Sequence, residues 1–192
     1  MEEIKNILLS LLKTNESENV EYKDAKNNFD CNELGRYFSA LSNGANLSGK
    51  QYAWLIFGVS DKTHEFVNTN YRLGSNLNGL KKELTQSTND NLTFLDIYEL
   101  EIDGNRIIML KIPAAIGVPT TWKGIAYDRN DDALVPLNDT KRNTILSTVN
   151  IDWSRQIVEG LSVEDLDKDA ILKAREQFKK KNENKSIAEE VD

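Results

Sequence analysis

A continuous apolar run, Tyr52-Ala-Trp-Leu-Ile-Phe-Gly-Val59, constrains the fold of this chain more than any other feature. Its length suits a strand, and a strand that is apolar at consecutive positions has to be buried on both faces. We therefore expect this segment in the centre of a sheet that other elements cover from both sides. The run ends at a turn, Ser60-Asp61-Lys62, which leaves a carboxylate just beyond the strand.

The remaining segments show helical or strand periodicity. Helices are predicted over residues 2–13, 31–45, 75–90, 138–149 and 162–181, and strands over 20–23, 65–67, 92–103, 106–113, 125–129 and 133–137. Asp30 is the expected N-cap of the second helix, and Asn43-Gly44 is expected to end it, because glycine tolerates the left-handed cap conformation. The clearest hairpin is expected to turn at Asp103-Gly104-Asn105, and Ser162 is expected to cap the last helix.

These elements predict an α+β fold with a mixed, mainly antiparallel sheet, packed helices, and additional helices at both ends. We expect an N-terminal helix over residues 1–13 and a central domain over residues 14–137. The helical extension over residues 138–192 is expected to lead into further domains of a longer protein.

Composition restricts the class of protein. The net charge is −7, which excludes a uniformly basic nucleic-acid-binding surface and leaves only a local basic groove. The single Cys31 rules out an intrachain disulfide and fits the reducing cytoplasm. With one His and one Cys, a zinc site built on those ligands within one chain is also excluded. No apolar run reaches membrane-spanning length, so we expect no membrane partner.

An acidic cluster is the best candidate for a site. Glu16 and Glu21 flank the start of the strand over residues 20–23, and Asp61 follows the central strand. If the two strands are neighbours, the three carboxylates converge and need a cation or a cationic partner. Lys23 shares a strand face with Glu21 and would neutralise transition-state charge in a metal-dependent nuclease. The alternative is an ordinary solvated strand face with cross-strand pairs.

The segment from Gly44 to Gln51 has the G-x-x-x-x-G-K spacing of a phosphate-binding loop. A working loop follows a strand and opens a helix, so that helix amides hold the phosphate. Here the predicted helix precedes the loop and the strand follows it, and Gln51 replaces the Ser or Thr that would hold magnesium. We therefore expect no ATP binding by this segment.

Residues near the end of the central domain are candidates for contacts with nucleic acid. Lys123 and Arg129 carry the charge for phosphate contacts, although pairing with Asp128 and Asp131 is the alternative. Tyr127 and Trp122 are the candidates for exposed aromatic rings on which bases stack. Lys23 joins this group from the acidic cluster.

At these residues the chain resembles a known family. The segments Glu16-Ser-Glu-Asn-Val-Glu-Tyr-Lys23, Phe38-Ser-Ala-Leu-Ser-Asn43 and Leu55-Ile-Phe-Gly-Val-Ser-Asp61 resemble, in order, motifs of the Schlafen AlbA_2 domain, which is also filed under divergent AAA proteins. Tyr127-Asp-Arg129 is similar to the family's Tyr-x-Arg segment. The chain departs from the pattern in its longer insertion over residues 43–50, which replaces an Asn-x-x-Gly-Gly turn.

The resemblance implies an α+β nucleic-acid-binding module over about residues 14–137. In bacteria such modules usually form the N-terminal part of proteins labelled transcriptional regulators, ATP-binding proteins or helicase-related proteins. Vertebrate relatives include metal-dependent endoribonucleases that act on tRNA and rRNA. Their two glutamates and one aspartate match Glu16, Glu21 and Asp61, which implies Mg²⁺ or Mn²⁺ as the cofactor.

The sequence therefore predicts a cytoplasmic nucleic-acid-binding module of a bacterial transcriptional regulator, with DNA and RNA both open as ligands. The first alternative is a divalent-metal-dependent endoribonuclease that uses Glu16, Glu21 and Asp61 as metal ligands and Lys23 as a helper. The second alternative is an ATP-binding regulatory domain. Because the vertebrate enzymes use a paired domain, a single copy would need to form a homodimer to supply one.

Overall fold

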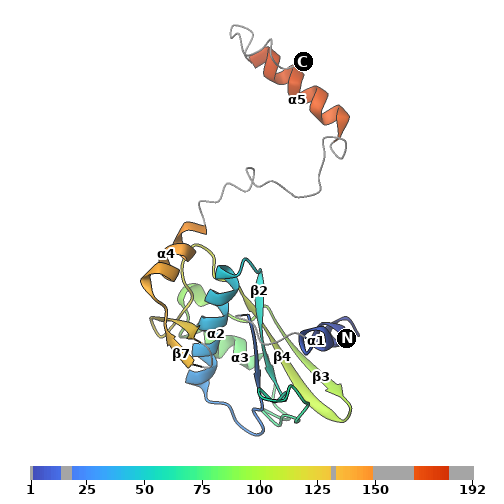
Figure 1. Ribbon diagram of the computed structural model, residues 1–192, viewed down its shortest axis with the longest axis vertical. Helices are drawn as coiled ribbons and strands as arrows, with labels where there is room; N and C mark the ends of the chain where they lie inside the picture. The colour runs from blue at the N-terminus through green and yellow to red at the C-terminus, as the bar shows by residue number, and fades with distance from the viewer. Residues whose placement is uncertain (1, 14–18, 131–132, 149–166, 182–192) are drawn as a thin grey trace. The chain divides into compact units, whose positions relative to one another are not determined.

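The computed structural model describes residues 2–13, 19–130, 133–148 and 167–181, and its contacts divide the chain into two units, residues 1–151 and 152–192. The first unit is an α+β fold with helices packed on two sheets (Figure 1), as the sequence predicts. Its helices are α1 (Glu2–Leu11), α2 (Cys31–Leu47), α3 (Gly79–Thr85) and α4 (Asp139–Ser147), with a short 3₁₀ helix η1 (Asn89–Asn91). Its strands are β1 (Val20–Lys23), β2 (Tyr52–Phe57), β3 (Asp96–Ile102), β4 (Asn105–Pro113), β5 (Thr121–Trp122), β6 (Ile125–Asn130) and β7 (Ala133–Pro136). The described part of the second unit is helix α5 (Lys168–Lys181).

The larger sheet has the strand order β1-β2-β4-β3. The edge strand β1 runs parallel to β2 and pairs Glu21 with Leu55, whereas β2, β4 and β3 are antiparallel. The apolar run is thus an internal strand of a mixed, mainly antiparallel sheet, as predicted. The smaller sheet is antiparallel, with the order β5-β6-β7.

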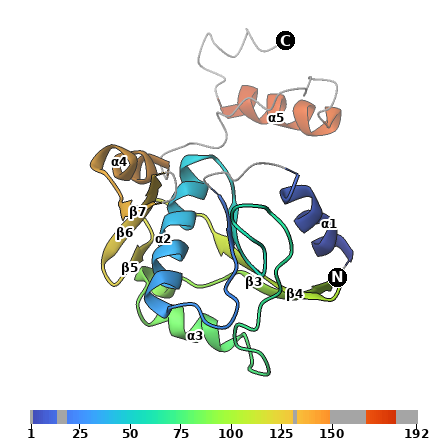
Figure 2. The same cartoon turned by 60° about the horizontal axis from the view of Figure 1, so that its bottom comes forward.

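Helices cover the two faces of the larger sheet, so β2 is buried on both sides (Figure 2). On one face, α1 contributes Leu8 to a core that includes Tyr22 and Trp54. On the opposite face, α2 and α3 pack on the alternate residues of β2 and β4, with Leu55 at the centre. Because side chains alternate along a strand, Glu21 and Lys23 of β1 point to the face that α2 covers.

Helix α2 begins where the sequence predicts but continues past the predicted end. The Asp30 side chain caps it by accepting the Glu33 amide hydrogen at 2.9 Å. Asn43 does not end the helix, because its buried amide bonds the backbone of Thr120 and the carbonyl of Tyr127, which holds α2 against the smaller sheet. The left-handed residue after the helix is Gly49, with a φ of 64°.

Other boundaries shift for local reasons. The expected strand near residues 65–67 is an isolated bridge between Val59 and Phe66. The helix expected over residues 75–90 shortens to α3, because the Asn76 side chain accepts the amide hydrogen of Asn78 and forms a turn instead. The hairpin turn between β3 and β4 needs only two residues. Asp103 and Gly104 both have positive φ, at 51° and 75°, as the tightest hairpin turns require, so Asn105 already pairs as strand.

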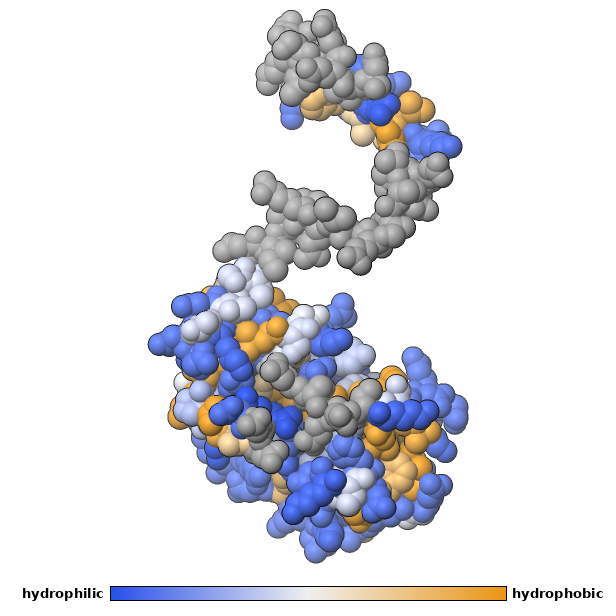
Figure 3. Space-filling view, in the orientation of Figure 1, coloured by the Kyte–Doolittle hydropathy of each residue, from blue (hydrophilic) through white to orange (hydrophobic). Residues whose placement is uncertain are grey.

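The structure describes two helices after residue 137, α4 and α5. Asn138 caps α4 by accepting the Lys141 amide hydrogen at 2.8 Å. The predicted cap of the last helix, Ser162, lies outside the described residues. Helix α5 exposes Leu172 and Phe178, and hydrophobic and hydrophilic residues both appear on its surface in Figure 3. In the part of the chain that the structure describes, no helix is long and apolar enough to cross a membrane.

Trp122 is not the exposed aromatic ring that the sequence suggested, because it is only 3% exposed and packs against α2. This packing depends on the absence of a side chain at Gly35. A Cβ atom there would lie 2.0 Å from the indole ring of Trp122, far inside van der Waals contact.

We predict that Gly35→Ala destabilises the fold by about 1–3 kcal/mol, because the indole has to shift in a packed core. The change would otherwise favour the helix, since alanine is the better helix former. Gly79→Ala is the matched control, because a Cβ atom at this helical glycine meets nothing within 4 Å. Urea unfolding midpoints measure the difference, and equal midpoints for the two variants would contradict the packing described for Trp122.

Candidate functional site

The Glu21 carboxylate lies between two cations. The Lys23 ammonium group is 2.6 Å from Oε1, and the guanidinium group of Arg129 is 2.7 Å from Oε2. The Glu21 side chain is only 4% exposed. A carboxylate removed from water to this degree needs its charge neutralised, and here two cations neutralise it from opposite ends.

Arg129 joins the two sheets at this point. It comes from β6 of the smaller sheet, whereas Glu21 belongs to the edge strand of the larger sheet. Its Nη1 atom also donates to the carbonyl oxygen of Val20 at 3.2 Å. Arg129 therefore holds both a side chain and a backbone group of β1. Its sequence neighbour Asp128 pairs with Lys141 of α4, at 2.7 Å, and Asp131, the other partner considered for Arg129, lies outside the described residues.

Lys23 makes contacts on three sides. Besides Glu21, its ammonium group lies 4.0 Å from the carboxylate of Asp61 and 5.1 Å from the centre of the Tyr37 ring. Burial is the strongest single influence on the Lys23 pKa and lowers it, but the hydrogen bond and charge of Glu21 together outweigh burial and raise the pKa. Lys23 thus stays protonated across the physiological pH range. Burial, and then the charge of Glu21, raise the pKa of the Tyr37 hydroxyl.

The three predicted carboxylates meet only in part. Lys23 brings Glu21 and Asp61 together, whereas Glu16 lies outside the described residues. Both oxygens of Glu21 already face cations, and within the described residues no group of three His, Cys, Asp or Glu side chains could hold a metal ion. The described residues alone do not fit a divalent cation. The metal site over all three carboxylates stays a prediction.

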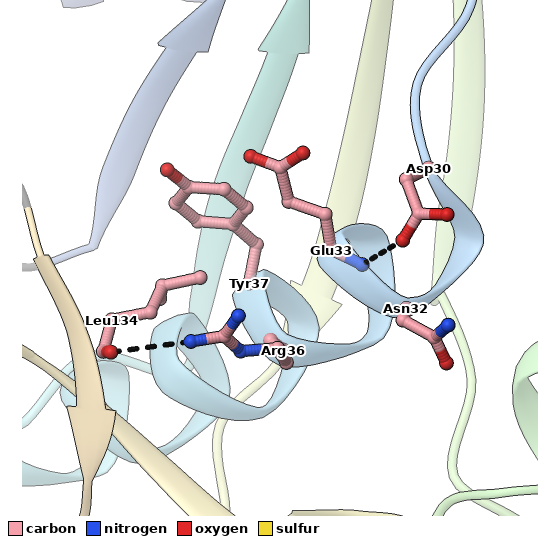
Figure 4. Close-up of a pocket in the computed structure, with 6 residues that line it drawn as sticks. All are labelled: Asp30, Asn32, Glu33, Arg36, Tyr37 and Leu134. Atoms are coloured by element: carbon pink, nitrogen blue, oxygen red, sulfur yellow. Dashed lines mark hydrogen bonds between the residues drawn. The ribbon is translucent and has the colours of Figure 1, made fainter.

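A surface hollow adjoins the cluster at the first turns of α2 (Figure 4). It has a volume of about 490 Å³ and is lined by Asp30, Asn32, Glu33, Arg36, Tyr37 and Leu134. The guanidinium group of Arg36 donates to the Leu134 carbonyl at 3.3 Å and lies 5.0 Å from the centre of the Tyr127 ring. No sequence motif pointed to Arg36 and Tyr37, which lie in the second turn of α2 after the Asp30 cap.

The contacts around the site close into a ring. Arg129 and Leu134 are opposite each other in the backbone register of β6 and β7. The Leu134 carbonyl oxygen accepts a hydrogen bond from Arg36, and Arg36 precedes Tyr37 in the chain. Tyr37 contacts Lys23, and Lys23 contacts Glu21, which binds Arg129. Three elements that are distant in the sequence, β1, α2 and the β6–β7 hairpin, therefore build one site.

The other predicted residues take different positions. Tyr127 is half-buried under Arg36, so one face of its ring is already occupied by a cation. Lys123 lies at the turn before β6, where its ammonium group contacts the side chain of Asn32 at the rim of the hollow. The segment from Gly44 to Gln51 keeps the predicted order, with α2 before it and β2 after it.

Comparison with known proteins identifies relatives of this chain. The family model described as Schlafen, AlbA_2 matches residues 16–138. The crystal structure of the DIP2311 protein from Corynebacterium diphtheriae is 17% identical, with a TM-score of 0.54 over 90% of this chain and 37% of that chain. The solution NMR structure of the N-terminal domain of an ATP-dependent DNA helicase RecG-related protein from Nitrosomonas europaea is 16% identical, with a TM-score of 0.41 over 67% of this chain and 88% of that one. A search of curated proteins gives no match.

These findings confirm the resemblance that the motifs indicated. The likeness to DIP2311 shows the fold, and this chain spans 37% of the length of that protein. The family match begins at Glu16 and extends through β7, so it includes each side chain of the ring of contacts.

We predict that Glu21→Gln destabilises the protein by about 3 kcal/mol or more, because it leaves two half-buried cations without their counter-charge. Glu83→Gln is the control. Glu83 makes a two-point contact with Arg72 at 2.8 and 2.6 Å but is 42% exposed, so its loss is expected to cost less than about 1 kcal/mol. Urea unfolding of both variants measures the difference. Losses of equal size would mean that Glu21 does not organise the site.

Proposed function

Because this chain belongs to the Schlafen AlbA_2 family, we propose that it is a nucleic-acid-binding module of a transcriptional regulator and that Lys23 and Arg129 contact phosphate groups. One observation carries the proposal: a single buried carboxylate holds both cations in fixed positions. An ammonium group has three N–H donors and a guanidinium group has five, which is more than one carboxylate oxygen can bind.

Fixing the cations in advance favours binding. A mobile surface lysine loses conformational entropy when it grips a phosphate, and this loss weakens the complex. Lys23 and Arg129 are already ordered by Glu21, and Tyr37 flanks Lys23 on the other side. Arginine also matches the geometry of a phosphate group, since two of its N–H groups can bind two phosphate oxygens.

Two cations lie close together on a chain that is acidic as a whole. Lys23 and Arg129 share the buried carboxylate of Glu21, and Asp61 lies 4.0 Å from Lys23. The net charge of −7 disfavours contact of nucleic acid with the chain in general. A local basic site on an acidic protein restricts contact with nucleic acid to one orientation.

We predict that Lys23→Ala weakens binding of an oligonucleotide and reduces the slope of log K against log salt by about 0.7–0.9, the effect of one lost phosphate contact. Lys82→Ala, at an exposed position of α3, removes the same charge away from the site and should leave both quantities unchanged. Fluorescence anisotropy with single-stranded DNA and RNA at several salt concentrations makes the comparison. Salt-independent binding, or equal effects of the two variants, would refute the phosphate contact.

A metal-dependent endoribonuclease is the second candidate, and one observation favours it. Lys23 lies within 2.6 Å of Glu21 and 4.0 Å of Asp61, so two of the three acidic residues that match the vertebrate enzymes do meet. In this arrangement Glu21 binds Arg129 rather than a metal ion. Nuclease activity therefore requires Glu21 to exchange a cationic side chain for a divalent cation.

Incubation of the full chain with tRNA and Mn²⁺ tests this second candidate. If it is right, cleavage depends on Mn²⁺ and is lost in Asp61→Asn, whose exposed side chain can change without loss of the fold. Asp24→Asn, a neighbouring exposed carboxylate that pairs with Lys26, should retain cleavage. If tRNA stays intact in the presence of Mn²⁺, the nuclease candidate fails, while the binding proposal is unaffected.

A further inference from the structure

The hollow at the start of α2 has the size of a small-ligand site and a mixed lining. Its volume of about 490 Å³ falls within the range of about 300–1,000 Å³ that is typical of such sites. Leu134 and Tyr37 supply an apolar side wall, whereas Asp30, Glu33 and Arg36 supply charged groups. Figure 4 shows the side chains of Glu33 and Tyr37 on one side of α2 and Arg36 turned toward Leu134.

Arg36 has hydrogen-bonding capacity that the protein does not use. Within the described residues, no carboxylate lies within ion-pair distance of its guanidinium group, and the buried Nε atom has no hydrogen-bond acceptor. The one bond that it makes, to the Leu134 carbonyl, is long at 3.3 Å. The Nε atom is buried and out of a ligand's reach, whereas the terminal N–H groups of the guanidinium group, of which one binds Leu134, have donors for a ligand in the hollow.

The charges in the hollow disfavour a second phosphate. Asp30 and Glu33 place two carboxylates at the rim against the single guanidinium group of Arg36, so an anion would be repelled. A nucleobase is neutral and presents both N–H donors and oxygen or nitrogen acceptors at its edge. The carboxylates would accept hydrogen bonds from the N–H groups of the base, and Arg36 would donate hydrogen bonds to its oxygen or nitrogen acceptors.

Position also links the hollow to the phosphate contacts. Tyr37 lines the hollow and lies 5.1 Å from the Lys23 ammonium group, while Leu134 lines it and pairs with Arg129. The hollow and the two cations are thus adjoining parts of one surface. A base and its own phosphate are separated by one sugar, so a single nucleotide can occupy both.

We propose that the hollow binds an unpaired nucleobase of a single-stranded nucleic acid. The phosphate group of the same nucleotide would lie beside Lys23 and Arg129. This inference rests on the proposed function, because the phosphate contacts bring the strand to the hollow. A base in a duplex is stacked and paired, so it cannot enter without leaving the helix. Specific recognition of single strands typically combines such base contacts with backbone contacts.

Changes in both the protein and the oligonucleotide test the proposal, with binding measured by fluorescence anisotropy at two salt concentrations. The probes are a labelled single-stranded RNA, its duplex, and the same strand with abasic residues. The single strand should bind about tenfold more tightly than either of the other two. Glu33→Gln, an exposed position, and Arg36→Met should each weaken binding of the normal strand several-fold and leave binding of the abasic strand unchanged.

Lys23→Ala serves as the matched variant, since it should weaken binding of the normal and the abasic strands by the same factor. If Arg36→Met and Glu33→Gln have the same effect on both strands, the hollow does not hold a base, although the phosphate contacts stand. Equal affinity for the normal and the abasic strand would also overturn the inference. If no probe binds in a salt-dependent way, the proposed function itself fails, and the inference fails with it.

Discussion

The neutralisation of one buried carboxylate organises the candidate site of this protein. Glu21 sits on an edge strand, faces the core side of the sheet, and is almost completely removed from water. It requires cations, and the fold supplies them from β1 itself and from the smaller sheet. The same contacts fix the smaller sheet against the larger one and hold two partly buried basic side chains in place. A substitution at Glu21 would therefore disturb the packing of the two sheets and the candidate site together.

Much of the fold follows from local sequence patterns. The apolar run predicted a strand covered on both faces, and the cap at Asp30 predicted the start of α2, because both depend on neighbouring residues alone. The end of α2 was mispredicted for a physical reason. The glycine signal at residue 44 was overridden by tertiary hydrogen bonds between Asn43 and Thr120, which lies 77 residues away in the sequence. A local rule contains no information about such a partner.

The strands that carry the site could be predicted from the sequence, but the ion pairs within the site could not. Period-two alternation correctly placed Glu21 and Lys23 on one face, and the order of motifs placed Asp61 next to them. The partner of Glu21 was not predictable, because Arg129 reaches it from a different sheet. The acidic residues of the motifs predicted a metal site. In the structure Glu21 and Asp61 lie beside basic side chains, and these basic side chains are the basis of the proposed phosphate contacts.

The most direct test of this account is NMR observation of the Lys23 ammonium and Arg129 guanidinium signals during titration with a short single-stranded RNA. The account predicts that both sets of signals shift on binding and that both groups keep their contacts with Glu21, because the RNA uses their remaining donors. The account would be contradicted if the RNA bound with shifts elsewhere in the protein while the signals of Lys23 and Arg129 stayed unchanged.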